Sequence, residues 1–272
     1  MKEVVKLIEK HVNERKIDRH QGLNVLLDFM VDLFDSSHFE KRNGFLDNWK
    51  IQAQKEPYLY QVTLIWLEKV SQAIEEGSWI DFFGVIYEEM YQSNRKASTL
   101  GQFFTPPSVC DMMSELSVPV YGRINDSACG SGRTLLALAS ASRFSRSNVY
   151  FGEDIDSVSV KMCALNLMIH GCRGFVLQHD SIVEKEMFDF GFRINDIRYP
   201  TPTPFYSLTR ISLTKEDIAR KNEKIRERYG DNVKVEQYNG YEVVKPNGKP
   251  KPLFENKETE CVQSCTQLSL FD

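Results

Sequence analysis

The stretch INDSACGSGRTLLALA, residues 124–139, constrains the fold of this chain more than any other segment. Asp126 ends a short strand-like segment, and Gly130 and Gly132 stand just ahead of an apolar run rich in alanine. Glycines in the turn between a strand and a helix let the backbone approach a ligand and present N–H groups toward it. The stretch therefore predicts a strand, a ligand-binding turn and a helix in direct succession.

The segments that follow continue this alternation. GRIND, NVYFGED and GFVLQHD have the pattern of strands, and SGRTLLALASAS and SVSVKMCALNLMIHG have the pattern of helices. Strands and helices in turn, with short connections, favour a parallel sheet of the Rossmann type. We therefore expect an α/β fold for this part of the chain, with FDFGFRIND as a candidate fourth strand.

The rest of the chain divides by composition into three expected domains. Apolar residues of the N-terminal region recur at spacings of three and four, which is typical of amphipathic helices. One of these helices is IDFFGVIYEEMYQSN, with Asp81 as its candidate N-cap. We expect an all-helical domain over 1–96, the α/β domain over 97–244, and a flexible C-terminal tail over 245–272, which has prolines and few large apolar residues.

The composition is that of a soluble globular chain, with 42% hydrophobic and 26% charged residues. No apolar run approaches the roughly 20 residues that a membrane span needs. The charged N-terminus has no apolar core of the kind found in signal peptides. These observations predict a cytoplasmic protein without a membrane partner.

The cysteines and the net charge limit the kinds of site further. The six cysteines are scattered, which predicts free thiols in a reducing compartment. Cys261 and Cys265 have no second Cys/His pair beside them, so we expect no metal site. The formal net charge is −4, so a nucleic-acid binder of this composition would have to concentrate positive charge locally.

The acids near the glycine turn indicate what it binds. A phosphate loop would carry Gly-Lys-Ser/Thr, whereas this turn has Gly-Arg-Thr preceded by Asp126, which repels a pyrophosphate and suits a cationic or amino-bearing ligand. Asp154 stands about two dozen residues after Gly130, where dinucleotide-binding folds place a carboxylate for ribose hydroxyls. S-adenosylmethionine, with its sulfonium, amine and adenosine, satisfies both acids. The alternative is a tight turn without a ligand.

Three motifs resemble a known family. GQFFTP (101–106), DSACGSG (126–132) and YFGEDID (150–156) resemble successive motifs of adenine-N6 DNA methyltransferases, in particular the modification subunit of type I restriction systems. The preceding DFFGVIYEEM resembles the helix that leads into the catalytic domain of that family. The resemblance covers roughly residues 80–190. It implies a Rossmann-like methyltransferase core, S-adenosylmethionine as cofactor, DNA as substrate, specificity or restriction subunits as partners, and a bacterial or mobile-element origin.

The resemblance also implies roles for individual residues. Residues 104–106 line the methionine end of the cofactor, the glycine turn lies under its amino-acid part, Asp154 or else Glu153 accepts the ribose hydroxyls, and Asp180 faces the adenine. Two of these positions have a simpler interpretation, because Pro106 can start a helix and Asp180 can cap a turn. The implied cofactor-binding residues are Phe104, Thr105, Pro106, Asp126, Ala128, Gly130, Ser131, Gly132, Asp154 and Asp180.

The catalytic motif of that family is missing. There, Asn-Pro-Pro-Tyr/Phe follows the fourth strand and holds an adenine that has been flipped out of the duplex. In FDFGFRINDIRY, Asn195 falls within about a residue of the position where the catalytic asparagine belongs, but Asp-Ile replaces the two prolines. In PTPFY, Pro204 and Phe205 resemble the second half of the motif, but Pro202 stands at the asparagine position. Asn195 is therefore the candidate catalytic residue.

The C-terminal QLSLF is an apolar island after a polar tail. It resembles the short peptide by which bacterial DNA-processing proteins bind the β sliding clamp, which implies contacts from Gln267, Leu268, Leu270 and Phe271. Such islands often dock in a groove as short linear motifs. The alternative is a hydrophobic C-terminus that folds back on the core.

Two functions follow from these observations. The first is a DNA adenine-N6 methyltransferase-like protein that binds S-adenosylmethionine and belongs to restriction-modification. The alternative is a catalytically inactive relative that binds S-adenosylmethionine or DNA and acts as a regulator or accessory subunit. The missing tetrapeptide favours the alternative, whereas the three motifs favour the enzyme.

Overall fold

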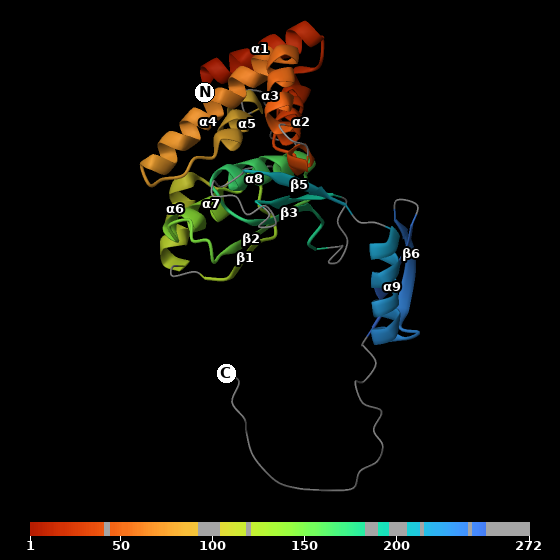
Figure 1. Cartoon of the computed structure of the whole chain (residues 1–272). Coiled ribbons are helices and arrows are strands. Elements are labelled where there is room, and N and C mark those ends of the chain that lie inside the picture. The colour runs from red at the N-terminus through yellow and green to blue at the C-terminus, as the bar shows by residue number, and fades with distance from the viewer. Residues whose placement is uncertain are drawn as a thin grey trace, which may run out of the picture. The chain divides into compact units, whose positions relative to one another are not determined.

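The structure is a computed structural model that describes residues 1–40, 44–91, 104–117, 121–182, 190–195, 206–212, 215–238 and 241–248. The chain divides into two compact units, Met1–Ser212 and Leu213–Asp272; Figure 1 shows the elements of each. Within these described ranges, no helix combines the length and the apolar character that crossing a membrane requires.

The first unit begins with a layer of helices. Apolar residues at helical spacing point into a common core, so that Ile8, Leu26 and Trp66 are completely buried. The long fourth helix begins at a proline, which suits the first turn of a helix because that residue needs no N–H donor. The helices of this layer are α1 (Lys2–Arg15), α2 (Gly22–Leu33), α3 (Gly44–Lys55), α4 (Pro57–Glu75) and α5 (Phe82–Tyr91), with short 3-10 turns at Arg19–Gln21 and Ser36–Glu40.

The central sheet contains three parallel strands separated by helices. Asp126 lies beside Gly152, and Asp154 lies beside Gln178, so the carboxyl ends of the parallel strands meet at one edge. This edge is where ligands bind in open α/β sheets. The elements are α6 (Pro107–Ser117), β1 (Arg123–Asp126), α7 (Arg133–Ala141), β2 (Val149–Asp154), α8 (Ser157–Ile169) and β3 (Gly174–Gln178).

Two antiparallel strands complete the sheet, in the order β1-β2-β3-β4-β5. β4 (Gly191–Ile194) pairs antiparallel with β3, and β5 (Leu208–Ile211) pairs antiparallel with β4. The α/β class expected from the sequence is confirmed, but the sheet is mixed rather than all-parallel. The candidate fourth strand runs back along β3, because an antiparallel neighbour needs no long crossover connection.

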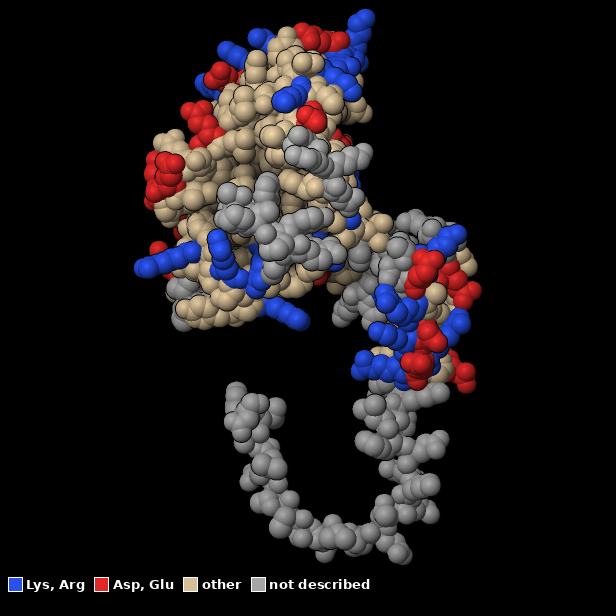
Figure 2. Space-filling view, viewed as in Figure 1, with Lys and Arg blue, Asp and Glu red and all other residues tan. Residues whose placement is uncertain are grey.

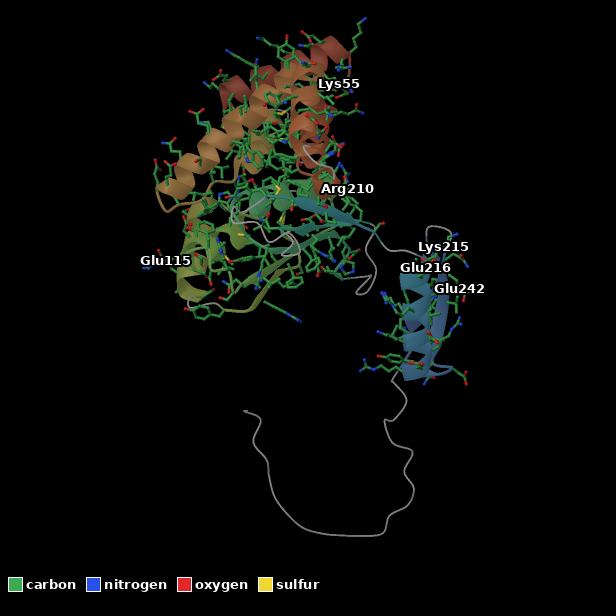
Figure 3. The ribbon with its side chains drawn as sticks, viewed as in Figure 1. Lys55, Glu115, Arg210, Lys215, Glu216 and Glu242 are labelled. Atoms are coloured by element: carbon green, nitrogen blue, oxygen red, sulfur yellow. The ribbon has the colours of Figure 1, made fainter. Side chains whose placement is uncertain are left out.

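The helical layer and the sheet share one core. Helix α8 is buried along almost its whole length, and it packs against α2 and α5 as well as against β2, β3 and β4. Strand β5 is also tied to the helical layer, because Leu208 N–H donates to Phe34 O at 2.8 Å and Arg210 (Figure 3) contacts Asp35 at 3.1 Å. The boundaries at 96 and 244 expected from the sequence thus differ from the single boundary, after residue 212, that divides the compact units.

The second unit is a helix packed on a hairpin. Ile218 and Ile225 of the helix and Val243 and Val244 of the hairpin are buried. Asn222 fastens the two together, because its amide donates to Glu242 O at 2.7 Å and its side-chain oxygen accepts Val244 N–H at 2.8 Å. The elements are α9 (Lys215–Tyr229), β6 (Val233–Tyr238) and β7 (Tyr241–Pro246), and the two strands are antiparallel.

A buried histidine joins the end of α8 to the segment ahead of α5. Nε2 of His170 accepts the backbone N–H of Ile80 at 3.3 Å, so Nδ1 carries the proton and donates to Asn166 O at 2.7 Å. Burial lowers the pKa of His170 to about 4, although the hydrogen bond to Asn166 acts in the opposite direction. The folded chain therefore holds this side chain neutral.

We expect the folded protein to lose stability as the pH falls from 6.5, the ordinary pKa of His170, toward about 4, its pKa in the folded chain. Over this window the unfolded chain binds a proton that the folded chain does not, which costs at most on the order of 3 kcal/mol. Urea unfolding across this range measures the effect. His170→Gln should flatten the pH dependence, whereas His38→Gln, at a partly exposed histidine, should not. Equal slopes in the two variants would contradict this.

Candidate functional site

The glycine turn lies between β1 and α7 and is tied to the end of β2. The N–H of Cys129 donates to Glu153 O at 2.9 Å, and the N–H of Gly130 donates to Oδ2 of Asp154 at 2.9 Å. The backbone φ angles of Gly130 and Gly132 are 53° and 91°, a region that side chains other than glycine rarely adopt. These two bonds hold the glycine turn against the end of β2, where Asp154 lies.

A side chain at either glycine would also collide with its surroundings. A Cβ on Gly130 would lie 2.9 Å from the ring of Phe104, and a Cβ on Gly132 would lie 2.9 Å from Sγ of Cys163. The absence of both side chains lets the turn lie directly between the Phe104 ring on one side and helix α8 on the other.

A cavity of about 410 Å³ opens beside this turn. It brings together most of the residues that the sequence assigned to the cofactor, whereas Pro106, Gly132, Asp154 and Asp180 do not line it. Met113 of α6 and Leu138 of α7 form apolar parts of its wall. The predicted residues that line the cavity are Phe104, Thr105, Asp126, Ala128, Gly130 and Ser131.

Asp126 is half-buried at the end of β1 and shapes the turn. Its Oδ1 accepts the N–H of Ala128 at 3.1 Å, and its Oδ2 accepts the hydroxyl of Thr134. A carboxylate has about four lone-pair sites, so these bonds leave acceptor capacity for a ligand. Thr134 was not among the residues predicted from the sequence, although it follows Gly-Arg in the motif.

Asp154 is the acid that accepts a hydrogen bond from the backbone of the glycine turn. Its Oδ1 accepts the N–H of Asp156 at 2.9 Å, in addition to the bond from Gly130. Burial raises the pKa of the Asp154 carboxyl, and the two backbone N–H groups oppose that rise. The neighbouring Glu153 contacts Nδ1 of His179 at 3.3 Å instead, so the two acids of this pair have different partners.

Two other residues that the sequence assigned to the cofactor, Asp180 and Pro106, do not line the cavity. Oδ1 of Asp180 accepts the N–H of Ile182 at 3.0 Å in the turn after β3, and the neighbouring Ser181 hydroxyl donates to Ser127 O at 3.1 Å. The carbonyl of Pro106 accepts the N–H of Cys110 at 3.1 Å, at the start of α6. These contacts agree with the simpler interpretation of the sequence, in which Asp180 caps a turn and Pro106 starts a helix.

Asn195 lies away from this cavity, and its placement gives no support to the catalytic role expected from the sequence. β4 runs antiparallel to β3, so its last residue, Ile194, lies beside Gly174 at the opposite end of the sheet from Asp154. The amide of Asn195 donates to Met168 O at 2.9 Å and Cys172 O at 2.7 Å, and its oxygen accepts Ser207 N–H at 3.2 Å. Its side chain therefore joins the end of α8 to β5. The competing Pro204 and Phe205 lie outside the described residues.

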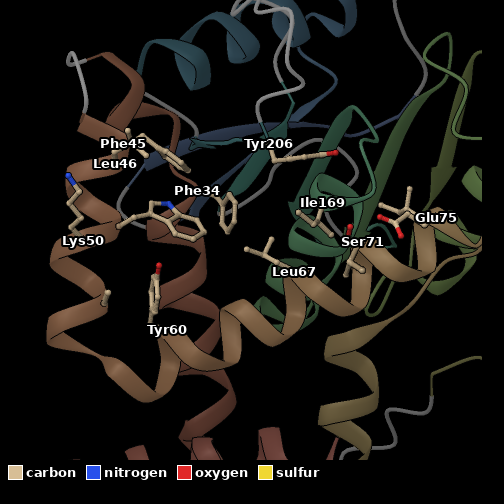
Figure 4. A pocket seen from close by; sticks show the side chains of 14 residues that line it. Phe34, Phe45, Leu46, Lys50, Tyr60, Leu67, Ser71, Glu75, Ile169 and Tyr206 are labelled. Atoms are coloured by element: carbon tan, nitrogen blue, oxygen red, sulfur yellow. The ribbon is translucent and has the colours of Figure 1, made fainter.

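A larger, mostly apolar cavity of about 720 Å³ lies in the helical layer (Figure 4). Phe34, Trp49 and Tyr60 line it, and Lys50 and Glu75 lie at its two ends (Figure 4). None of the residues that the sequence assigned to cofactor binding or catalysis lines this cavity. The glycine turn, rather than this cavity, is therefore the candidate site.

Asp81 is a buried acid that links the glycine turn to the helical layer. Its Oδ1 accepts the N–H of Gly84 at 2.8 Å, which confirms the N-cap expected for α5, and also the amide of Asn166 at 2.7 Å. Its Oδ2 accepts the Ser131 hydroxyl at 2.6 Å and Nε of Arg133 at 2.5 Å. One carboxylate thus joins α5, the glycine turn, α7 and α8. The capping pattern was visible in the sequence, but these long-range partners were not.

Arg133 extends this network to the wall of the cavity. Its Nη1 donates to Glu88 at 2.8 Å and to Thr105 O at 3.4 Å, and its guanidinium lies 5.3 Å from the centre of the Phe104 ring. Burial alone would lower the pKa of Arg133, but the hydrogen bonds and charges of Glu88 and Asp81 outweigh burial and raise it. Arg133 therefore stays charged and holds residues 104 and 105 against the turn.

We expect Asp81→Asn to lower the free energy of unfolding by about 3 kcal/mol or more, because it leaves the guanidinium of Arg133 buried without its closest acid. Urea denaturation at neutral pH measures the loss. Asp111→Asn is the matched control, since Asp111 accepts the indole N–H of Trp79 at 2.8 Å in an exposed position; its loss should stay below about 1 kcal/mol. Similar losses in the two variants would refute a central role for Asp81.

Comparisons with known proteins agree with this geometry. The model of the family described as N-6 DNA Methylase matches residues 78–238, more than half of the chain. The match begins just ahead of α5 and includes β1, β2 and β3 with the glycine turn.

Similar curated proteins are methylase subunits of type I restriction enzymes. The MjaIX subunit of Methanocaldococcus jannaschii is 21% identical over 179 residues, which is 63% of this chain and 32% of that protein. The HindI subunit of Haemophilus influenzae is 31% identical over 99 residues, 34% of this chain and 22% of that protein. The EcoEI subunit of Escherichia coli is 26% identical over 191 residues, 63% of this chain and 37% of that protein.

The matched part of the chain therefore spans 22% to 37% of the length of these curated relatives. The family model covers Asp81 with the helix that it caps, the glycine turn, and Asp154, which accepts a hydrogen bond from that turn. By this match the chain belongs to the N-6 DNA Methylase family.

Proposed function

We propose that this chain binds S-adenosylmethionine in the cavity beside the glycine turn and acts as a DNA adenine-N6 methyltransferase of the type I restriction-modification kind. The observation that carries the proposal is the hydrogen bond from Gly130 N–H to Asp154, which joins the glycine motif to the second acid of the pattern. Bound S-adenosylmethionine supplies an electrophilic methyl group. The family and the names of the relatives support DNA as the acceptor of that group.

The residues of the cavity fit this cofactor. The volume of about 410 Å³ lies within the range of about 300–1,000 Å³ usual for small-molecule sites. Asp126 offers a half-buried carboxylate for the amine, and the backbone of the turn can approach closely because neither glycine carries a side chain. The Phe104 ring offers a face that attracts cations such as the sulfonium. Arg133 holds that ring and Thr105 in place.

The residues that would hold the adenine, the acceptor of the methyl group, are less complete than those of the cofactor site. An adenine amino group reacts once hydrogen-bond acceptors hold its two hydrogens, and the Asn-Pro-Pro-Tyr/Phe motif that does this in the family is missing from the sequence. The side chain of Asn195, the nearest candidate, is engaged with α8 and β5. This observation favours a second function, a relative that binds S-adenosylmethionine or DNA without methyl transfer and serves as a regulator or accessory subunit.

The partners are part of the same proposal. The relatives are subunits of type I restriction enzymes, so we propose that this chain also works beside specificity or restriction subunits. Such partners would supply the choice of DNA sequence.

We expect the purified chain to bind S-adenosylmethionine in a calorimetric titration and Asp126→Asn to weaken that binding about tenfold or more, because a neutral amide loses the charge-assisted bond to the amine. The amide keeps an acceptor for Ala128, so the turn retains its shape. Asp47→Asn, on exposed α3, is the matched control and should bind as the wild type does.

The same preparation, incubated with labelled S-adenosylmethionine and unmethylated bacterial DNA, separates the two functions. Transfer of label to adenine supports the methyltransferase. Binding without transfer supports the inactive relative. If the wild type does not bind, or if Asp126→Asn binds equally well, the cofactor assignment is wrong.

The C-terminal QLSLF supports a further partner, the bacterial β sliding clamp; these residues lie outside the described part of the chain. We expect the wild type to be retained on immobilised clamp and a Leu268→Ala/Phe271→Ala double variant to be lost, because apolar anchors carry most of the binding energy of such peptides. Ser269→Ala keeps both anchors and is the matched control. Equal retention of all three proteins would remove the clamp from the list of partners.

A further inference from the structure

Two buried thiols meet at the glycine turn. Lys, Arg, Asp and Glu are mixed over the surface of the helical layer (Figure 2), whereas the free cysteines in the described part of the chain are all buried. Cys129 belongs to the glycine turn and lines the cavity beside it. Cys163 is completely buried on α8, the helix against which the turn lies. One thiol of the pair thus borders the cavity, and the other lies behind it.

The two sulfurs share the space beside a glycine of β2. A Cβ on Gly152 would lie 3.1 Å from Sγ of Cys129 and 3.2 Å from Sγ of Cys163, so both sulfurs border the position that the missing side chain leaves open. Gly132 leaves room in the same way, because a Cβ there would lie 2.9 Å from Sγ of Cys163. Glycines at both positions therefore let the two thiols come together.

The two thiols are also hydrogen-bonded to each other. This bond, more than burial, raises the pKa of the Cys163 thiol well above its ordinary value. The Cys129 thiol in turn donates to Gly130 O at 3.7 Å, so its sulfur accepts the hydrogen of Cys163. Cys163 therefore stays protonated at neutral pH and points at the sulfur of Cys129.

We propose that Cys129 and Cys163 are an oxidisable dithiol, which hydrogen peroxide entering the cavity converts to a disulfide. Sγ of Cys129 attacks one peroxide oxygen, the O–O bond breaks, and the other oxygen leaves as water with the thiol proton, which gives a sulfenic acid. Sγ of Cys163 then attacks the sulfur of Cys129, the S–O bond breaks, and the proton of Cys163 completes a second water. The two sulfurs lose two electrons in all, which the peroxide accepts.

The disulfide would change the shape of the turn. It holds its sulfurs about 2 Å apart, closer than two unbonded sulfurs come. The backbone of Cys129 is held on both sides, since its N–H donates to Glu153 O at 2.9 Å and its carbonyl accepts Gly132 N–H at 2.8 Å. Drawing Cys129 toward α8 displaces its neighbours Ala128 and Gly130, which line the cavity. We therefore infer that the disulfide closes the site to S-adenosylmethionine, a consequence that rests on the proposed function.

The test maps the disulfide in the full chain after treatment with hydrogen peroxide and blocking of the remaining thiols. Trypsin cleaves after Lys and Arg, so it releases Cys129 in residues 124–133 and Cys163 together with Cys172 in residues 162–173. Mass spectrometry of the unreduced digest should show these two peptides joined. Cys172→Ala, which removes another buried thiol, should keep the peptides joined, whereas Cys163→Ala should separate them.

The second measurement is the calorimetric titration with S-adenosylmethionine. We expect oxidation to weaken binding to the wild type and to Cys172→Ala about tenfold or more, because one lost hydrogen bond from the turn accounts for about that much. Dithiothreitol should restore the binding, since a thiol reductant reverses a disulfide. Cys163→Ala should bind equally well before and after peroxide. Cys163→Ser nearly keeps the size of the side chain and replaces that variant if the alanine does not fold.

Three outcomes would overturn the proposal. The first is that peroxide leaves the two peptides separate. The second is that they are joined but the affinity for S-adenosylmethionine stays the same, so that the disulfide closes nothing. The third is that peroxide weakens Cys163→Ala as strongly as the wild type, which would assign the loss to another oxidised side chain, such as the half-exposed Met113 in the cavity wall.

Failure of the proposed function gives a different result. If the reduced wild type does not bind S-adenosylmethionine, the cofactor assignment is wrong. The joined peptides do not depend on the cofactor, so their presence supports the dithiol and their absence overturns it.

Discussion

The buried carboxylate of Asp81 is the contact on which the candidate site depends. It accepts hydrogen bonds from Gly84, Ser131, Arg133 and Asn166, and therefore joins α5, the glycine turn, α7 and α8 at one point. A buried charge costs several kcal/mol unless partners satisfy it, and here the donors come from four separate elements. Any displacement of the turn relative to α5 would break one of these bonds. The position of the turn is thus fixed by contacts with the helical layer as well as by contacts with the sheet.

The local pattern predicted the elements around the turn but not the pairing of the later strands. GRIND and SVSVKMCALNLMIHG became β1 and α8, because the spacing of apolar residues is a local property of the chain. The antiparallel direction of β4 did not follow from its sequence, since a strand pattern says which residues face the core and nothing about which neighbour the strand pairs with. That direction places Asn195 at the end of the sheet opposite Asp154, so the structure gives no support to the catalytic role expected of it. Its side chain satisfies the carbonyls of Met168 and Cys172, contacts that depend on the pairing of β4 with β3.

The candidate site was predictable from the sequence where it depends on local structure. Asp126, the two glycines and Asp154 follow from a strand–turn–helix unit and the strand after it, so their proximity needs only local structure and one parallel pairing. Arg133 and Asp81 are 52 positions apart, and nothing in the sequence indicated that they touch. The expected boundary at residue 96 separated them, whereas the family match beginning at residue 78 places α5 with the glycine turn.

Arg133 raises an electrostatic question for a site that we propose to bind a cation. Its guanidinium lines the cavity, and alone it would repel a sulfonium or an amine. Asp81 and Glu88 contact it directly at 2.5 and 2.8 Å, so the group of three carries a net negative charge, to which Asp126 adds another. The arginine can therefore position Phe104 and Thr105 without making the cavity positive. This arrangement needs Asp81 at the N-cap of α5 and Glu88 within that helix, so the helix and its cap contribute to the charge of the site as well as to its packing.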